Sequence, residues 1–337
     1  MPSFRALGDM STTFMLSRQT YALKSEVQQA SQELGSGQRA DLSAALRGDF
    51  RALASIERGL QLAQAERITI AEAQGVTGAA QLALGVVQDQ TSRIAGVLLA
   101  VPDAPTLPTL ERAGAEARQA LDALVGALNL PYADRAVFAG DATDGRALAA
   151  AETMLADLEL AIAGATTAAD VANAVEAWFD TPGTGFDTIG YLGSDTGLAP
   201  FRLGGGERAD FSARADDPAL RETMKGFAMA ALLEGNAFTG TITERLELSR
   251  TAAVKLLNAQ DRVTDLQATI GNAEASIARA EVRSGTERAA LEIARGGLIG
   301  ADPFEAATRL ETAQTQLETL FALTARVSRM TLVDFLR

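Results

Sequence analysis

The stretch "LSRQTYALKSEVQQASQELGSGQR", residues 16–39, decides the fold. Its apolar and small side chains recur in alternating steps of four and three residues, at Leu16, Thr20, Leu23, Val27, Ala30 and Leu34. This spacing is the heptad pattern of a helix that packs along one seam against another helix. Gly35 and Gly37 follow the last seam position at once. They predict the end of that helix and a hinge before the next one.

The heptad pattern returns towards the other end of the chain. Residues 240–297 carry it from Leu256 to Ala280, and a last helix carries it after Pro303, at Leu310, Ala313, Leu317, Leu320, Thr324, Val327 and Thr331. Between them, in "ARGGLIGADP", Gly296 and Gly297 predict a second hinge. Each end therefore has a terminal heptad helix, a glycine break and a longer heptad helix.

Proline defines the remaining helices, because it costs about 3 kcal/mol inside a helix. A second long helix is expected from about residue 50 to about residue 100, and "VPDAPTLPTL" ends it. A shorter helix is expected at about 109–129. Beyond it, glycine turns separate short alternating runs of apolar residues, which predict a small antiparallel sheet (Phe186, Ile189, Tyr191; Phe201, Leu203; Ala209, Phe211).

These patterns predict a mainly α fold. It is an elongated antiparallel helical bundle or coiled coil formed by both termini, with a small inserted α+β domain that contains a β-hairpin. The expected domains are the terminal coiled coil (1–36 plus 303–337), the helical bundle core (37–131 plus 241–302) and the inserted, surface-exposed domain (132–240).

Composition excludes several functions. The net charge is −13 with a pI near 4.6, and the basic residues are not clustered, so nucleic acid is not an expected partner. The chain has no cysteine and no histidine, which removes thiol nucleophiles, imidazole bases and thiolate metal sites. We therefore expect no catalytic residues, no cofactor and no metal, and not an enzyme.

Two short motifs have a chemical and a structural interpretation. "FRLGGGERADF", residues 201–211, could offer backbone amides to a phosphate, but the companion residues of known phosphate loops are absent, which favours a hairpin turn. "DATDG", residues 141–145, lacks the further ligands of a calcium loop, which favours an ordinary turn. The pair Asp216 and Asp217 is expected to cap the helix that follows Pro218.

Both terminal helices carry large apolar residues outside the main seam: Phe14, Met15 and Tyr21 at one end, and Phe321, Met330, Leu332 and Phe335 at the other. A second apolar stripe requires a second partner, and copies of the same chain are the simplest supplier. The expected subunit-packing residues are Leu16, Leu23, Val27, Leu34, Leu310, Leu317, Leu320, Phe321, Val327, Leu332 and Phe335.

The N-terminal sequence has no apolar core typical of a secretory signal peptide, and the longest apolar run, near residue 94, is too short to cross a bilayer. These rules alone place the chain in the cytoplasm, unless a pathway that does not read such signals exports it.

The termini resemble a known family. "LSRQTYALKSEVQQASQELGSGQR" is similar to the N-terminal helix and "L-S-S-G-x-R" junction of bacterial flagellins and hook-associated proteins, and "RLETAQTQLETLFALTARVSRMTLVDFL" resembles their C-terminal helix. "PYADRAVFAGDAT" is similar to a segment of the family's hook-filament junction proteins, matching at Arg135, Val137, Phe138, Ala139, Gly140 and Thr143. Two features depart from the pattern: "ADLSAALRGDF" lacks the usual acidic pair, and "TDGRAL" lacks the common "P-F".

The resemblance implies a structural subunit of the bacterial flagellum, a hook-filament junction protein that self-assembles through its terminal helices and connects hook to filament. It also implies other flagellar axial proteins and an export chaperone as partners, and an extracellular location reached by type III export. A flagellin, forming the filament itself, is the alternative within the family. A helical signalling or scaffold module is the alternative of another class, since it could share the heptads.

Overall fold

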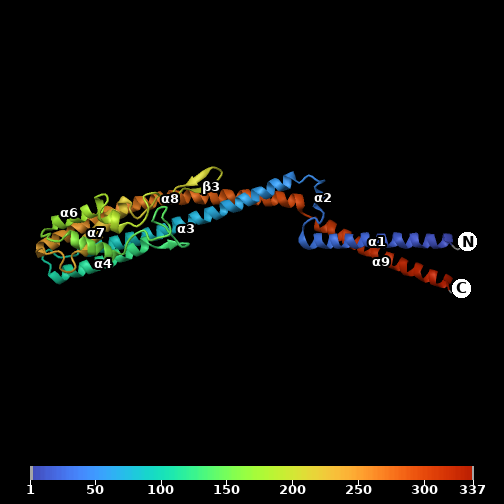
Figure 1. Ribbon diagram of the computed structural model, residues 1–337, viewed down its shortest axis with the longest axis horizontal. Coiled ribbons are helices and arrows are strands. Elements are labelled where there is room, and N and C mark those ends of the chain that lie inside the picture. The colour runs from blue at the N-terminus through green and yellow to red at the C-terminus, as the bar shows by residue number, and fades with distance from the viewer. Residues whose placement is uncertain (1–2, 336–337) are drawn as a thin grey trace. The chain divides into compact units, whose positions relative to one another are not determined.

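The computed structural model describes residues 3–335, and the side chains of residues 11 and 13–326. The protein is mainly α, as predicted, with a few short strands (Figure 1). Its contacts divide it into two units, which are described separately: unit 1 comprises residues 1–63 and 285–337, and unit 2 comprises residues 64–284. The boundary falls inside two long helices, α3 (Arg51–Leu99) and α8 (Ile242–Ile299). The three-domain division expected from the sequence stays a prediction.

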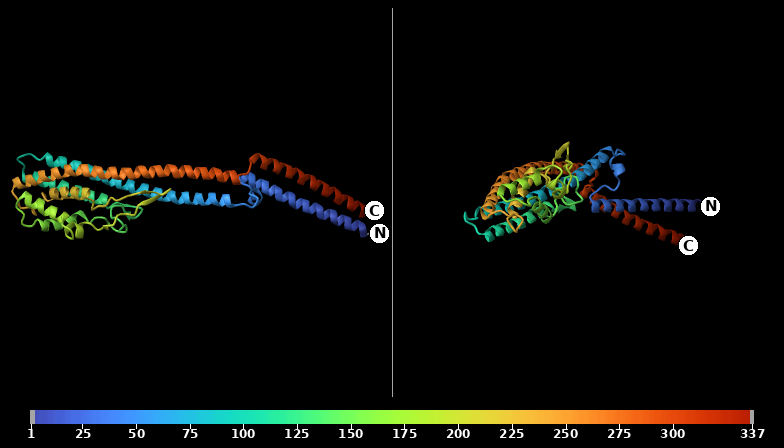
Figure 2. Two further views of the ribbon diagram at one scale, coloured as in Figure 1. Left: turned by 90° about the horizontal axis from the view of Figure 1, so that it is seen from above. Right: turned by 60° about the vertical axis from the view of Figure 1, so that its left-hand side comes forward.

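Unit 1 brings the two ends of the chain together. Helix α1 (Ser3–Ser36) pairs with α9 (Pro303–Phe335), and the left view of Figure 2 shows them side by side. Their seam contains buried small residues, among them Ala30, Ala306 and Ala313. The short helix α2 (Leu42–Ala45) and the adjoining ends of α3 and α8 complete the unit. The pairing of the two terminal helices predicted from their heptads is therefore present.

In unit 2, α3 and α8 run antiparallel. The amide of Gln74 donates to Glu281 at 2.7 Å, and that of Gln81 donates to the Gln267 carbonyl oxygen at 3.0 Å. The hydrogen-bond partners on α8 therefore have lower residue numbers as the residue numbers on α3 rise, as in antiparallel helices. Heptad residues along both helices are buried, including Ala73, Leu84, Leu256 and Val263.

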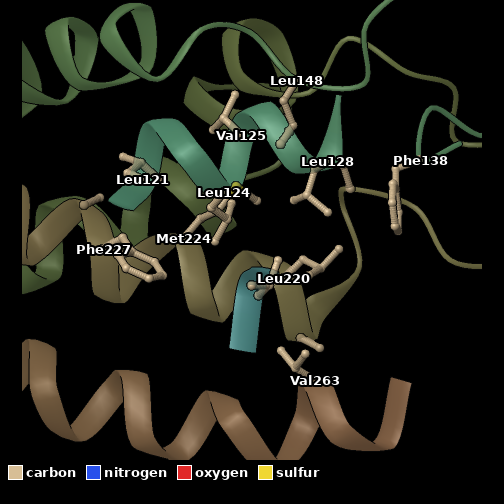
Figure 3. Packing of buried hydrophobic residues seen from close by; sticks show 14 of the residues in the cluster. Leu121, Leu124, Val125, Leu128, Phe138, Leu148, Leu220, Met224, Phe227 and Val263 are labelled. Atoms are coloured by element: carbon tan, nitrogen blue, oxygen red, sulfur yellow. The ribbon is translucent and has the colours of Figure 1, made fainter. Parts of the chain in front are cut away.

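Four further helices cover this pair: α4 (Leu107–Leu128), α5 (Ala151–Ala161), α6 (Ala168–Asp180) and α7 (Pro218–Ala231). The core lies where α4 faces α7, around Leu121, Leu124, Met224 and Phe227 (Figure 3). Asp217 caps α7 by accepting a hydrogen bond from the Ala219 N–H, with Pro218 in the first turn, as the sequence predicts.

The β structure consists of two separate antiparallel hairpins. One pairs β1 (Pro131–Tyr132) with β2 (Arg135–Ala136), and the other pairs β3 (Phe201–Gly204) with β4 (Glu207–Ala209). The second confirms the hairpin interpretation of "FRLGGGERADF". The first was not predicted, because its turn residues, Ala133 and Asp134, adopt positive φ without the usual Asn-Gly signal.

The prediction of a strand through Phe186, Ile189 and Tyr191 is wrong. Residues Phe186–Gly190 form a π-helical turn, η1, closed by a 2.7 Å hydrogen bond from the Tyr191 N–H to the Phe186 carbonyl oxygen. Phe186 is fully buried and packs against the Trp178 and Phe179 rings of α6. Burial of this aromatic cluster therefore overrides the local alternation of apolar residues.

We expect two glycine substitutions in α4 to act in opposite directions. A Cβ on Gly114 would lie 2.5 Å from the Glu234 backbone nitrogen, whereas a Cβ on Gly126 would meet nothing within 4 Å. G126A should stabilise unit 2 by up to about 1 kcal/mol through helix propensity. G114A should destabilise it by about 1–3 kcal/mol through overpacking against backbone. Urea unfolding of both variants checks this, and a stabilising G114A would show that α4 is not closely packed there.

Candidate assembly interface

The outer surface of the terminal helix pair exposes large apolar side chains. On α1, Phe14 and Tyr21 lie seven residues apart, on one face, and are 69 % and 73 % exposed. On α9, Phe321 and Leu323 are exposed, and Phe304 near the start of the helix is 82 % exposed. Met15 is also exposed. We call these six residues the apolar stripe. Phe321 and Leu323 are two residues apart and so point to different sides of α9. Exposed apolar residues on helices that already share a seam favour contact with a further molecule.

The structure divides the predicted subunit-packing residues into three groups. Those of the seam between α1 and α9 are half-buried or buried: Leu16, Leu23, Val27, Leu310, Leu317 and Leu320. Two are exposed: Leu34 and Phe321. The side chains of the others, Val327, Leu332 and Phe335, lie outside the described residues. The seam residues hold the helix pair together, while the exposed ones are accessible to another chain.

Leu34 does not occupy the last seam position that its spacing predicts. Glu33 does, and it is only 7 % exposed. One carboxylate oxygen of Glu33 accepts a 3.0 Å hydrogen bond from the Ala40 N–H, and the other accepts one from the Arg309 guanidinium of α9. A single side chain thus ties α1 to the loop that follows it and to α9. The heptad pattern alone gave no signal for this contact.

The pKa of Glu33 lies below its usual value. Burial raises this pKa, but the hydrogen bonds from Ala40 and Arg309, together with the charges of Arg309 and Arg39, lower it by more. The Glu33 carboxylate is therefore ionised near neutral pH. The ionised form accepts the hydrogen bonds from Ala40 and Arg309.

The two glycine breaks are hydrogen-bonded to each other. Gly37 ends α1 at a φ of +67°, and its carbonyl oxygen accepts a 3.0 Å bond from the Ala301 N–H. The Arg39 N–H donates to the Ile299 carbonyl oxygen at 2.8 Å, and its guanidinium donates to the Gly300 carbonyl oxygen at 3.1 Å. The joint foreseen at Gly37 is thus a crossing of two chain segments.

The other predicted hinge glycines lie within helices. Gly35 belongs to the last turn of α1, while Gly296 and Gly297 belong to α8. The second break comes three residues later, at Gly300. A Cβ added to Gly300 would lie 2.5 Å from the Gly296 carbonyl oxygen. Hinge motion at these glycines stays a prediction.

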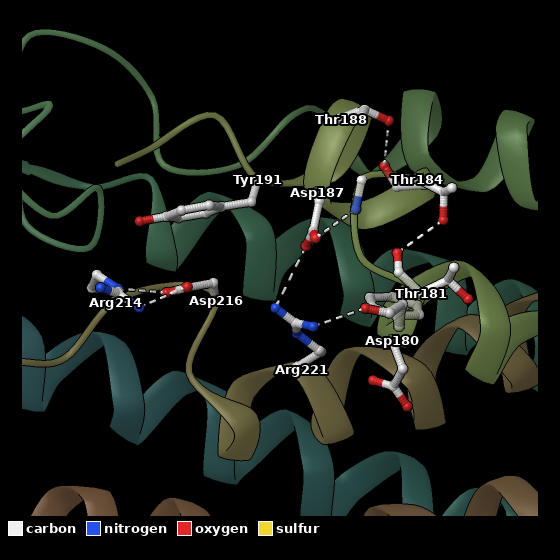
Figure 4. Close-up of polar contacts among 12 residues, drawn as sticks. Asp180, Thr181, Thr184, Asp187, Thr188, Tyr191, Arg214, Asp216 and Arg221 are labelled. Atoms are coloured by element: carbon white, nitrogen blue, oxygen red, sulfur yellow. Dashed lines mark hydrogen bonds and ion pairs between the residues drawn. The ribbon is translucent and has the colours of Figure 1, made fainter. Parts of the chain in front are cut away.

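The polar clusters of unit 2 bind loops to helices (Figure 4). Arg214 forms a bidentate pair with Asp216 at 2.7 and 2.8 Å. Arg221 donates to the Phe179 carbonyl oxygen at 3.0 Å and lies over the Phe186 ring. The Tyr191 hydroxyl donates to the Ser194 carbonyl oxygen, and burial, with the nearby Asp216 charge, raises the pKa of Tyr191 to about 12. These contacts connect the loops of unit 2 to its helices.

A second ionic network joins α6, α7 and α8. The buried Lys225 ammonium contacts Asp180 at 2.6 Å and Glu222 at 2.5 Å, while Lys255 contacts Glu176 at 2.9 Å. Burial raises the pKa of Glu222, but Lys225 and Lys255 lower it by more. Within the described residues, no group of three or more acidic side chains is arranged to hold a metal ion, and no helix is long and apolar enough to span a membrane.

Because of Glu33, the α1–α9 pair should become less stable as the pH falls into the acidic range. Its lowered pKa contributes stability that is complete above its unfolded value, near 4.5, and is lost as the pH falls through the folded value. E33A, which leaves the Ala40 N–H and Arg309 unpaired, should cost about 1–3 kcal/mol at pH 7. Hydrogen exchange of α1 amides measures this loss. E33Q should remove the acid dependence, and E26A is the exposed control. Equal exchange in E33A and wild type would contradict the role of Glu33.

Residues 254–336 match the family model described as the bacterial flagellin C-terminal helical region. The match covers about a quarter of the chain, namely most of α8 and α9. No curated protein matches the chain. The flagellin family is structural rather than enzymatic, and it self-assembles into flagellar polymers. Helix α9, which forms the seam with α1 and carries three of the six stripe residues, therefore lies within the part of the chain that matches the flagellin C-terminal helical region.

Proposed function

We propose that this chain is a structural subunit of the bacterial flagellum that self-assembles through α1 and α9. One observation carries the proposal: the two ends of the chain form a helix pair whose outer surface exposes the apolar stripe. The match of residues 254–336 to the flagellin C-terminal region supports it independently. A helical signalling or scaffold module would explain the heptads but not this match.

The energetics of the helix pair favour assembly. Burying an exposed Phe, Met or Tyr fully is worth about 1.5–3 kcal/mol per side chain. The seam itself buries mainly alanines, such as Ala30, Ala306 and Ala313, which remove little apolar area from water. Neighbouring copies would supply the burial that the pair lacks. Repeated head-to-tail contacts that do not close would give a tube.

We further propose that the subunit acts at the hook-filament junction. The support is the similarity of residues 131–143 to a segment of the junction proteins. In the structure this segment forms the β1–β2 hairpin and then places Val137, Phe138 and Ala139 in the core of unit 2. Because the similarity includes core positions, a flagellin with the same core is the second candidate. Type III export, with a dedicated chaperone, is part of the same proposal.

Replacing Phe14 and Tyr21 of the apolar stripe should weaken self-assembly without unfolding the chain. In F14S/Y21S, two exposed side chains lose their contact with the next copy. If each contributes about 1.5 kcal/mol, the concentration needed for assembly should rise about a hundredfold. Pelleting of the purified chain, with negative-stain microscopy, measures this, and Q19S/Q29S is the matched control on α1. Assembly of F14S/Y21S at the wild-type concentration would contradict the proposed contact.

In the source bacterium, deleting residues 305–337 should abolish motility and filaments, because α9 supplies one half of the seam. Two further measurements separate the candidates. Antibody labelling should mark only the filament base for a junction protein, and the whole filament for a flagellin. A strain without the gene should release unassembled flagellin into the medium if the chain is the junction protein. Normal filaments in the deletion strain would refute a flagellar role.

A further inference from the structure

The β3–β4 hairpin of unit 2 carries an unusual pair of like charges. Arg202 and Arg208 stand directly opposite each other in its register, and both are exposed, whereas Phe201, Leu203 and Ala209 face the core. Arginines placed this way have Cβ atoms about 5 Å apart and repel each other. Neither guanidinium forms an ion pair with any side chain that the structure describes, in a chain whose net charge is −13. The pair is unfavourable in the isolated subunit, which is typical of a functional contact.

The hairpin is held firmly against its own helices. The Glu207 carboxylate pairs with Arg283 of α8 at 2.8 Å. Gly204 lies so close to Glu66 of α3 that a Cβ there would overlap the Glu66 carboxylate. Gly204 at the end of β3 and the turn residues Gly205 and Gly206 all have positive φ, and Figure 1 shows the hairpin projecting from the helices of unit 2. The two arginines are therefore presented on a fixed support.

A complementary pair of acids lies on α8. Asp261 and Asp265 are four residues apart on the exposed face, so their Cβ atoms lie about 5–6 Å apart and they repel each other. Neither forms an ion pair with a described side chain; Arg262, between them, is exposed and also unpaired. One and two turns earlier on the same face, Leu257 and Val254 are 41 % and 54 % exposed. This face, which we call the acidic face, combines two carboxylates with two apolar residues.

The two pairs match in charge and spacing but cannot meet within one subunit. The hairpin is anchored beside Arg283, and Asp265 lies eighteen residues earlier on the same helix, which is about 27 Å away. A second copy of the chain brings them together. Four charges that are exposed in the single subunit then form two ion pairs, and Leu257 and Val254 become covered.

We propose that the β3–β4 hairpin of one copy docks on the acidic face of α8 in a neighbouring copy, with Arg202 and Arg208 bound to Asp261 and Asp265. The contact rests on the proposed self-assembly and specifies its register. Parallel neighbours joined this way are shifted by about 27–33 Å along α8. Because the contact is heterologous, each copy offers one hairpin and one acidic face, so the contact propagates.

Charge exchange tests the contact. R202D/R208D and D261R/D265R each place like charges across it, so each should raise the concentration required for pelleting at least tenfold at low salt. The quadruple variant should return to within about threefold of wild type. R112D/R146D and D89R/D122R change the same number of exposed charges elsewhere in unit 2, and should assemble as wild type does. Circular dichroism confirms that each variant is folded, and R202Q/R208Q replaces R202D/R208D should the latter unfold.

The outcomes separate this contact from self-assembly in general. If wild type assembles and both charge variants assemble equally well, the hairpin contact is refuted while the proposed function stands. If only R202D/R208D is impaired, and the quadruple variant is not rescued, the arginines bind something other than the acidic face. Tight binding of inorganic sulfate by the unassembled chain, lost in R202Q/R208Q, would identify that partner as a small anion. If wild type does not assemble at all, both proposals fail.

Discussion

The structure depends on the closure of the chain, in which the first and last helices share one seam. The specific polar contacts of this closure lie at the junction end of the two helices. At the junction, backbone hydrogen bonds between the segments around Gly37 and Gly300 fix the crossing of the two connections, and Glu33 ties the connection after α1 to α9. Away from the junction, α1 and α9 are held by alanines and half-buried aliphatic residues. Small residues let two helices approach closely, but they contribute little burial.

Unit 2 buries more large apolar side chains than unit 1 does. Unit 2 buries large side chains from both helices and loops, including Phe138, Phe186, Phe227 and Phe238. Among the described residues of unit 1, the buried apolar residues larger than alanine are Leu53, Ile299 and Leu320. Stability is therefore distributed unevenly between the two units. A subunit of this kind gains most from partners where its own core is thinnest, which is where the apolar stripe lies.

The sequence predicted the long helices well, because the heptad pattern is local and extends over many turns. The bounds of α3, α4 and α8 differ by few residues from those expected, and the seam of α1 was correct except at its last position. There, the pattern favoured Leu34, but the carboxylate of Glu33 has hydrogen-bond partners from two other segments. The η1 turn and the β1–β2 hairpin were also not predicted, because the local pattern of apolar residues does not determine either of them. Phe186 is placed by the Trp178 and Phe179 rings, and the Ala133–Asp134 turn carries no strong local signal.

Two kinds of surface contribute differently to an assembly of acidic subunits. Apolar side chains such as Phe14 and Tyr21 supply binding energy, but the hydrophobic effect is non-directional and does not fix how copies slide along each other. Copies with a net charge of −13 also repel each other, and salt screens this repulsion over about 10 Å at 0.1 M. A basic pair on a rigid hairpin, opposite an acidic pair on a long helix, acts only at short range and only in one register. The terminal helices can then provide strength, while the charged pairs in unit 2 determine register.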